Sequence, residues 1–287
     1  MKDASSKKVA PSKSSLLRHT ITPEDAAAMT APEGVAFHTD TVGGISACGA
    51  SQATLVPAMR FSGGWFNLGS AQAYRNLVGH IAVRTGAEAF VPDYRLAPEH
   101  PFPAAKNDAQ ACYRGLIERG IRGIAISGDS AGGNLALVVL WLATTSGGRI
   151  PVEAAVLSPV TDLALTGESF ETRSEADPYF VRAQVEGLIR SYLGDTDPKS
   201  PLASPLYGNL AGLPPISIHV GDDEVLLDGS RRYFERAVTA GVDARLDVWE
   251  GMSHRFVGSV GTLAAAAKAL DAVGKFLAKR LKAAAGV

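Results

Sequence analysis

The stretch Gly128-Asp129-Ser130-Ala131-Gly132 decides how this chain is interpreted, because it joins an apolar run at 121–126 to another at 134–143. A G-x-S-x-G pattern in that setting is typical of a strand, a sharp turn and a helix, with the serine at the tip. The turn requires a positive φ at Ser130, which costs about 1–3 kcal/mol for a non-glycine residue. The bare pattern also fits a glycine-rich turn with an incidental serine, so the rest of the chain has to decide.

The bulk composition favours one globular enzyme-sized domain. The chain has 287 residues, of which 46% are hydrophobic, and its net charge is −1. That charge gives no case for nucleic acid or an anionic membrane as partner. Cys48 and Cys112 are too few for a disulfide framework and have no neighbours at metal-ligand spacing, so we interpret both as small core fillers.

The N-terminal residues carry lysines among serines, but they contain no apolar stretch of signal-peptide length. We therefore expect a cytoplasmic protein. Thr22-Pro23-Glu24-Asp25 predicts the start of a helix, with an N-cap threonine, a proline at the first position and acids in the first turn. The longest apolar run, 135–143, fits a buried helix and is too short to span a membrane.

Short apolar runs alternate with helical patterns along the chain, which predicts an α/β fold with a mostly parallel sheet and helices on both faces. The expected strands are Val35–Thr39, Ala53–Phe61, Ala87–Pro92, Gly123–Ser127, Ala154–Ser158, Ile216–Val220 and Ala244–Trp249. The expected helices are Ala71–Arg84, Ala104–Arg119, Gly132–Thr144, Gly229–Thr239 and Thr262–Lys282.

One long segment, between Ser158 and Ile216, interrupts the alternation. It is rich in turn formers, contains a helical stretch at Val181–Leu193, and carries aromatic residues that argue for order. Long insertions in compact domains are usually lids or linkers. We expect a single domain over 1–287, with a helical cap formed by about 1–33 and 161–209.

A serine needs a base to become a nucleophile, and in the fold that carries this turn the acid and then the histidine follow it. Only His219 and His254 follow Ser130. His219 lies within a buried-looking strand and precedes every acid of the next loop, which favours a core residue, whereas His254 follows a strand end and suits the base. Four carboxylates on one loop remain open as the acid: Asp222, Asp223, Glu224 and Asp228.

The chain resembles the esterases related to hormone-sensitive lipase, the bacterial family IV or GDXG hydrolases, which have the α/β-hydrolase fold. The resemblance covers about residues 35–280 and rests on five motifs. They are Asp93-Tyr94-Arg95-Leu96-Ala97-Pro98-Glu99-His100-Pro101-Phe102-Pro103-Ala104-Ala105, the elbow 128–133, Ser158-Pro159-Val160-Thr161-Asp162-Leu163, Ala203-Ser204-Pro205-Leu206-Tyr207, and Gly221-Asp222-Asp223-Glu224-Val225-Leu226-Leu227-Asp228. The resemblance implies Glu224 as the acid, with Asp228 as the second choice and better suited to ordering the loop.

The oxyanion loop departs from the family pattern. Relatives carry His-Gly-Gly-Gly, whereas this chain has Ser62-Gly63-Gly64-Trp65. The resemblance implies that the oxyanion is held by the N–H groups of Gly63, Gly64 and Ala131. Trp65 is expected to reshape this loop, to lay its indole across the acyl or alcohol pocket, or to pack beneath the lid.

The implied function is a serine carboxylesterase that hydrolyses short- to medium-chain esters through an acyl-enzyme on Ser130, with no metal or organic cofactor. The substrate site is expected to include Trp65, Phe66, Asp129, Phe180 and Val225. Two alternatives remain: a non-catalytic ligand-binding homologue, like the plant gibberellin receptors of this family, and a lactonase, thioesterase or amidase. The expected partner is a small-molecule ester, and the edge strand Ala244–Trp249 makes a homodimer a reasonable expectation.

Overall fold

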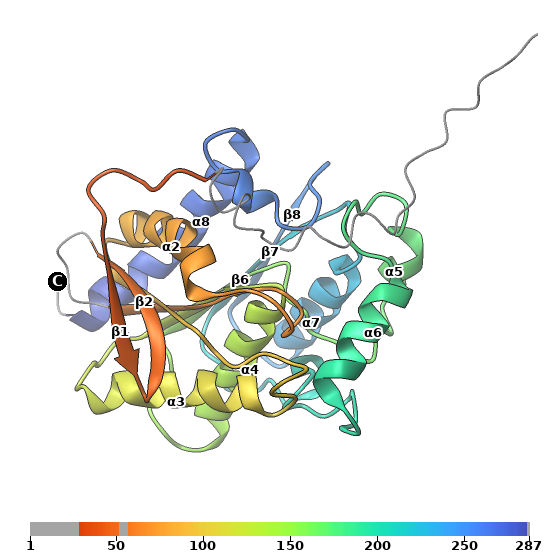
Figure 1. The fold of residues 1–287 in the computed structure, drawn as a ribbon, viewed down its shortest axis with the longest axis horizontal. Helices are drawn as coiled ribbons and strands as arrows, with labels where there is room; N and C mark the ends of the chain where they lie inside the picture. The colour runs from red at the N-terminus through yellow and green to blue at the C-terminus, as the bar shows by residue number, and fades with distance from the viewer. Residues whose placement is uncertain (1–28, 52–56, 286–287) are drawn as a thin grey trace, which may run out of the picture.

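The strand that leads into Ser130, β5 (Ala125–Asp129), lies inside an eight-stranded sheet (Figure 1). The computed structural model describes residues 29–51 and 57–285. The strand order in the described chain is β1-β2-β4-β3-β5-β6-β7-β8; β2 is antiparallel to both neighbours, and all the other pairs are parallel. The remaining strands are β1 (Ala36–Val42), β2 (Ile45–Ser51), β3 (Pro57–Phe61), β4 (Glu88–Pro92), β6 (Glu153–Leu157), β7 (Ile216–Gly221) and β8 (Ala244–Trp249).

Helices cover both faces of this sheet (Figure 1). One face is covered by α2 (Ala71–Thr85) and α8 (Ala264–Ala285). The other is covered by α3 (Ala104–Glu118), α4 (Ala131–Thr145) and α7 (Leu227–Thr239). A right-handed crossover between parallel strands places successive helices on the two sides in this way.

Strand β6 shows how the apolar sequence is divided between the two faces. Its residues Ala154 and Val156 belong to the core beside α3 and α4, while Ala155 and Leu157 belong to the core beside α2 and α8. Successive side chains of a strand point to opposite faces, so a strand covered on both sides reads as a continuous apolar run. This is why the central strands were predictable from short apolar runs.

Most expected elements are found within two or three residues of their predicted ends. Strand β2 is the exception, because no strand was expected at Ile45–Ser51. Its sequence contains Cys48, Gly49 and Ala50, which are small and lack the β-branched or aromatic character of typical strands. The helix predicted from Thr22, the cap portion before residue 29 and the beginning of the strand predicted at 53 lie outside the described residues.

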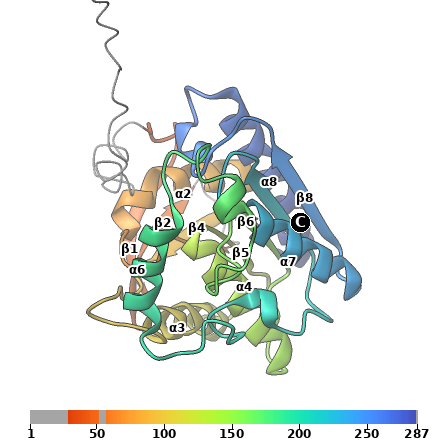
Figure 2. The same ribbon diagram turned by 90° about the vertical axis from the view of Figure 1, so that its right-hand side faces the viewer.

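The segment that follows β6 forms a layer beyond the ends of the parallel strands (Figure 2). It contains α5 (Ser169–Thr172), α6 (Arg182–Leu193) and the short 3-10 helix η2 (Pro205–Tyr207). The expected helix at Val181–Leu193 is therefore present as α6. Side chains of α6 such as Val185 and Tyr192 are buried in the core that includes α3 and α4, so this segment is packed on the domain.

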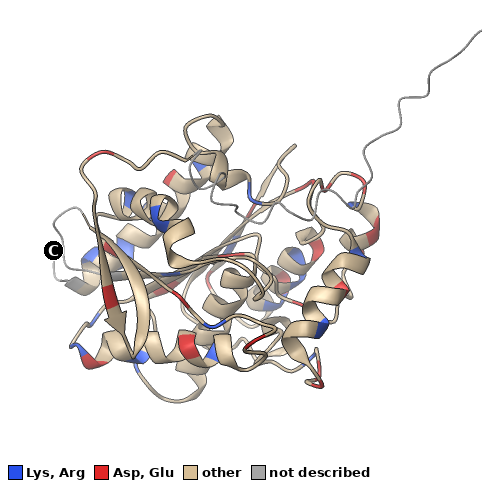
Figure 3. Cartoon of the chain, in the orientation of Figure 1, with Lys and Arg blue, Asp and Glu red and all other residues tan. Residues whose placement is uncertain are grey.

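Acidic and basic residues are interspersed along the helices and loops (Figure 3). That distribution agrees with the small net charge of −1. Among the described residues, no helix combines the length and hydropathy that a membrane crossing requires.

Candidate active site

The turn between β5 and α4 has the strained geometry that the sequence predicts. Ser130 has φ 54° and ψ −121°, a backbone conformation that costs about 1–3 kcal/mol for a non-glycine residue. Two hydrogen bonds hold it there: the Ser130 N–H donates to the Leu157 carbonyl, and the Val160 N–H donates to the Ser130 carbonyl, both at 3.0 Å. The neighbouring strand β6 therefore stabilises the turn.

Both flanking glycines are required by close approach. A Cβ atom on Gly128 would lie 2.1 Å from the Gly132 carbonyl oxygen, and one on Gly132 would lie 2.1 Å from the Phe61 carbonyl oxygen. No side chain can be accommodated at such distances without moving backbone. The two glycines of the G-x-S-x-G pattern therefore mark the positions where backbone segments of the turn come into direct contact.

Glu224 and His254 form a buried hydrogen-bonded pair beside this turn. His254 Nδ1 lies 2.8 Å from Glu224 Oε2, and both side chains are at most 2% exposed. The other carboxylate oxygen, Oε1, accepts hydrogen bonds from the Ser158 hydroxyl at 2.7 Å and the Gly221 N–H at 2.6 Å. The acid is therefore held rigidly, and it orients the imidazole through one defined nitrogen.

The other acids of this loop have different partners. The second candidate, Asp228, accepts a hydrogen bond from the Ser169 N–H at 2.7 Å, so it orders the start of α5. Asp222 accepts the Gly251 N–H at 2.7 Å. The structure thus brings Glu224 to His254 and turns Asp228 toward the segment after β6.

His219 is a core residue, as its position within β7 suggested. It is 1% exposed, and it contacts the Ser217 hydroxyl at 3.1 Å and the Trp249 indole N–H at 3.3 Å. Burial lowers the pKa of His219 from 6.5 to about 4, against the opposing charge of Asp247.

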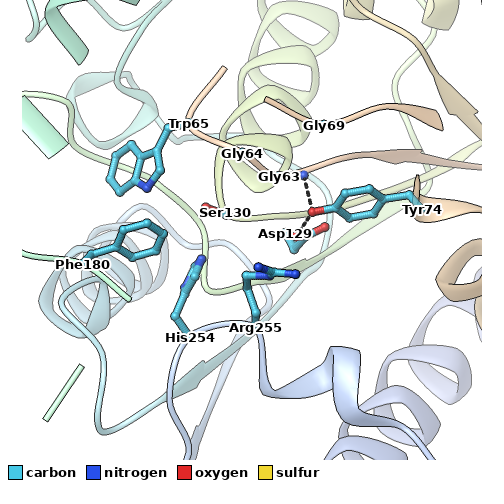
Figure 4. A pocket seen from close by; sticks show the side chains of 10 residues that line it. All are labelled: Gly63, Gly64, Trp65, Gly69, Tyr74, Asp129, Ser130, Phe180, His254 and Arg255. Carbon is cyan, nitrogen blue, oxygen red and sulfur yellow. Dashed lines mark hydrogen bonds between the residues drawn. The ribbon is translucent and has the colours of Figure 1, made fainter. Parts of the chain in front are cut away.

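Ser130 and His254 line the same pocket (Figure 4), whose free volume is about 20 Å³. The pocket is lined by Gly63, Gly64, Trp65, Gly69, Tyr74, Asp129, Ser130, Phe180, His254 and Arg255. The Ser130 hydroxyl is buried and has no hydrogen-bond partner among the described residues. Its link to the imidazole is therefore not formed in this structure; such links often tighten only when substrate binds.

One of the three N–H groups expected to bind the oxyanion, that of Gly63, already has another acceptor in the structure. Gly63 was expected to offer its N–H to the oxyanion, but this N–H donates to the Tyr74 hydroxyl at 2.9 Å. The same hydroxyl donates to Asp129 Oδ2 at 2.9 Å, and Arg60 Nη2 binds Asp129 Oδ1 at 2.7 Å (Figure 4 shows the Tyr74 bonds). Arg60, Asp129, Tyr74 and Gly63 thus form a buried chain of hydrogen bonds, called the relay below. Because the Gly63 N–H donates to Tyr74, it does not point a free donor at the oxyanion.

Three other N–H groups near the pocket, two on the oxyanion loop and one after Ser130, have no hydrogen-bond acceptor among the described residues. For the N–H groups of Gly64, Trp65 and Ala131, no acceptor is found in the part of the chain that the structure describes. Gly64 has φ 122° and Trp65 has φ 51°. A positive φ is strained for a non-glycine residue such as Trp65, so the loop holds an unusual backbone conformation beside the pocket. Gly64 and Ala131 thus remain open as donors, and Trp65 joins them.

Two side chains brace this loop where relatives have a histidine. The Tyr94 hydroxyl donates to the Ser62 carbonyl at 2.7 Å. The Asn67 amide donates to the Trp65 carbonyl at 2.6 Å and to the Leu188 carbonyl of α6 at 3.1 Å. The loop is therefore fixed through its backbone from two sides, which compensates for the short reach of the Ser62 side chain.

The five expected substrate-site residues separate into two groups. Trp65, Asp129 and Phe180 line the pocket, and the Phe180 ring lies edge-on to Trp65 at 5.5 Å between centroids. Phe66 instead stacks on Tyr192 at 3.9 Å, and Val225 is fully buried on the acid loop. Neither of these two is among the residues that line the pocket, because both side chains are packed in the core beneath it.

Several residues of the site were not among the site residues expected from the sequence. They are Tyr74 and Arg60 in the relay, Ser158 on the acid, Arg255 beside His254, and Asp177. Asp177 accepts the N–H groups of Val225 and Phe180, and burial raises its pKa against the opposing charge of His254. Only Ser158 could have been found, since it lies inside a motif quoted for the family resemblance.

No cluster of three or more histidine, cysteine or carboxylate residues with metal-binding geometry occurs within residues 29–51 and 57–285. The pocket that contains Ser130 is lined by the oxyanion loop, which offers backbone N–H donors, and by His254, whose Nε2 can accept a proton. This arrangement suits attack on a carbonyl carbon followed by stabilisation of the negative oxygen.

Known proteins that are similar to this chain include hydrolases and esterases. A family model described as alpha/beta hydrolase fold matches residues 58–258. An acetyl-hydrolase of Streptomyces hygroscopicus is 38% identical over 217 residues, covering 75% of this chain and 73% of that protein. An esterase of Acinetobacter venetianus is 38% identical over 197 residues, covering 68% of this chain and 65% of that protein.

Solved structures give the same result. The crystal structure of an esterase from the bacterial hormone-sensitive lipase family superimposes with a TM-score of 0.86 and is 37% identical. The match covers 89% of this chain and 88% of that one.

Proposed function

The chain belongs to the alpha/beta hydrolase fold family, among the relatives of hormone-sensitive lipase, and from that membership we infer that it is a serine carboxylesterase. The observation that carries the proposal is the Glu224–His254 pair at 2.8 Å, which faces the same small pocket as the strained Ser130. A buried carboxylate that fixes one imidazole nitrogen leaves the other nitrogen free to act as a base.

In the first half of the reaction the Ser130 oxygen attacks the ester carbonyl carbon, and His254 Nε2 takes the hydroxyl proton. Glu224 stabilises the imidazolium that results. The carbonyl oxygen becomes an oxyanion, and we assign its donors to the N–H groups of Gly64 and Ala131, together with the adjacent N–H of Trp65. One such donor contributes about 3–4 kcal/mol in the transition state.

The tetrahedral intermediate then expels the alcohol. The bond between the carbonyl carbon and the alkoxy oxygen breaks, and His254 gives its proton to the departing oxygen. A water molecule enters, His254 removes its proton, and attack on the acyl-enzyme releases the carboxylic acid and restores Ser130. Every proton is carried by His254, so the cycle needs no other acid or base.

The size of the pocket supports small acyl groups. Trp65 and Phe180 close one side of it, and Phe180 also lies edge-on to His254 at 5.0 Å. We propose short acyl chains, with acetyl esters as the best substrates, and the naming of the Streptomyces relative as an acetyl-hydrolase supports this.

The test is hydrolysis of p-nitrophenyl acetate by the wild type and by Ser130→Ala, with Ser146→Ala as a matched control because Ser146 caps the far end of α4. We expect Ser130→Ala to lose hydrolysis and labelling by a fluorophosphonate probe, while the control keeps both. Full activity in Ser130→Ala would refute the proposal. An unreactive Ser130 in folded wild-type protein would favour a receptor-like homologue, although such a protein has no need of an intact acid–base pair.

We also propose homodimerisation through β8. This strand is one of the two edges of the described sheet, and its Val248 side chain is 41% exposed. An uncovered edge strand is a template for pairing with another chain. Light scattering on the purified protein, compared with a Val248→Lys variant, tests it: a monomeric wild type would refute the proposal.

A cytoplasmic location is our further proposal. Cys48 and Cys112 are buried free thiols, which is usual in a reducing compartment. Fractionation of cells that produce the protein tests the location directly.

A further inference from the structure

The indole N–H of Trp65 is a buried donor with no partner. The Trp65 side chain is 1% exposed, and for its Nε1 no hydrogen-bond acceptor is found in the described chain. In Figure 4 the nitrogen edge of the ring lies on the side of Ser130, within the pocket that both residues line. A buried polar group without a partner is rare in proteins and calls for an explanation.

The ring cannot turn this N–H away easily. The Trp65 carbonyl is held by the Asn67 amide at 2.6 Å, and the indole lies edge-on to Phe180 at 5.5 Å. Asn67 in turn accepts a hydrogen bond from Ser191 of α6 at 2.5 Å. These bonds fix the Trp65 backbone to the oxyanion loop and to the segment after β6, while burial against Phe180 restricts the indole ring itself.

Other polar groups of this pocket already have partners. The Gly63 N–H binds Tyr74, the Tyr74 hydroxyl binds Asp129, and His254 Nδ1 binds Glu224. Ser130 and His254 Nε2 are used by the reaction itself. Among the described residues that line the pocket, the indole N–H of Trp65 is a donor that neither the fold nor the acyl-transfer steps employ.

The free space is large enough for about one water molecule, which can accept the Trp65 N–H until substrate enters. A substrate that displaces this water without offering an acceptor leaves the donor unpaired, whereas one with a well-placed oxygen restores the bond. A site with a buried donor discriminates between two such substrates even when their shapes are equal.

We propose that the indole N–H of Trp65 is a specificity-determining donor that selects esters carrying a second oxygen acceptor close to the scissile ester. The acceptor is an ether, hydroxyl or carbonyl oxygen in place of a methylene group. This inference rests on the proposed esterase function and extends it to a substrate class. The second oxygen can lie on the acyl side or on the alcohol side, and the two arms of the experiment distinguish them.

The acyl arm compares p-nitrophenyl methoxyacetate with p-nitrophenyl butyrate, which differ by one oxygen in place of one methylene. The alcohol arm compares 2-methoxyethyl acetate with butyl acetate, which differ in the same way. The measured quantity is the ratio of kcat/KM for the oxygen-containing ester to kcat/KM for the hydrocarbon ester. Differences in intrinsic reactivity cancel when this ratio is compared between wild type and Trp65→Phe, because the variant removes the N–H and keeps an aromatic ring.

We expect Trp65→Phe to lower the ratio about fivefold in one arm, the effect of one neutral hydrogen bond. The matched control is Trp141→Phe. The Trp141 Nε1 is also buried without an acceptor in the described chain, but it lies on α4 outside the pocket. This control should leave both ratios unchanged, and thermal unfolding should show that both variants are folded.

The outcomes separate this inference from the function on which it rests. A fall of the ratio in the acyl arm or the alcohol arm supports the donor and assigns its side. Hydrolysis with unchanged ratios in both arms, or an equal loss on all four esters, overturns the inference and leaves the esterase intact. Failure of wild-type protein to hydrolyse any of the four esters overturns both.

Discussion

Removal of one hydroxyl group, in Tyr74→Phe, tests whether the buried relay positions the oxyanion loop. The Tyr74 hydroxyl accepts the Gly63 N–H and donates to Asp129 Oδ2, each at 2.9 Å. Burial and the neighbouring Asp129 charge hold the pKa of Tyr74 well above its usual value of 10, so the group is a neutral hydroxyl throughout the working pH range. Phenylalanine keeps the ring and removes both bonds.

The expected loss follows from the two groups that become unpaired. The Gly63 N–H and Asp129 Oδ2 are buried, and each unpaired buried group costs about 1–3 kcal/mol. Arg60 still binds the other Asp129 oxygen, so we expect a total near 3 kcal/mol, about 6 °C in Tm for a chain of this size. Release of the Gly63 N–H also lets the adjacent Gly64 donor move, and misplacement of about 1 Å lowers kcat by up to about 100-fold.

The assay is steady-state hydrolysis of p-nitrophenyl acetate, with urea unfolding of the same samples. Tyr113→Phe is the matched control, because the Tyr113 hydroxyl is similarly buried and donates to the Arg149 carbonyl at 2.8 Å, away from the pocket. We expect both variants to lose stability, but only Tyr74→Phe to lose kcat, with KM changed little. Equal kcat values for wild type, Tyr74→Phe and Tyr113→Phe would show that the relay has no influence on the reaction.

Three further predictions concern the acid, the loop and the core histidine. Glu224→Gln should lower kcat by about 10³–10⁴ and Asp228→Asn by less than about tenfold; comparable losses on p-nitrophenyl acetate would contradict the assignment of the acid. Gly63→Ala should reduce both stability and kcat, because its Cβ would lie 2.7 Å from Asp129 Oδ2; a wild-type Tm would contradict the packing argument. His219 has a folded-state pKa of about 4 against 6.5 unfolded, so the unfolded chain binds the proton first. The free energy of unfolding should therefore fall by about 2 kcal/mol from pH 6.5 to 5 and level off below pH 4. Urea midpoints of wild type and His219→Asn measure this fall, which should be smaller in the variant.

The elements of the fold were predictable because their signals are local. Strands β4 to β7 carry short apolar runs and β8 alternates between apolar and polar residues, while the long helices carry apolar residues on one face or, in α4, nearly all round. Strand β2 carries no such signal, since its small residues are held in the sheet by pairing with β1 and β4. Its existence depends on partners elsewhere in the chain, which a local pattern does not contain.

The sequence by itself determined the elbow at Ser130, because Gly128 and Gly132 mark positions where backbone atoms touch, and it restricted the base to one histidine after a strand end. Which of four carboxylates reaches His254 was decided only by the tertiary structure, since neighbouring residues on one loop point in different directions. The acceptor of the Gly63 N–H was also decided only by the tertiary structure. Its acceptor, Tyr74, is oriented by Asp129, 55 residues further along the chain, and hydrogen-bond direction depends on where distant elements pack.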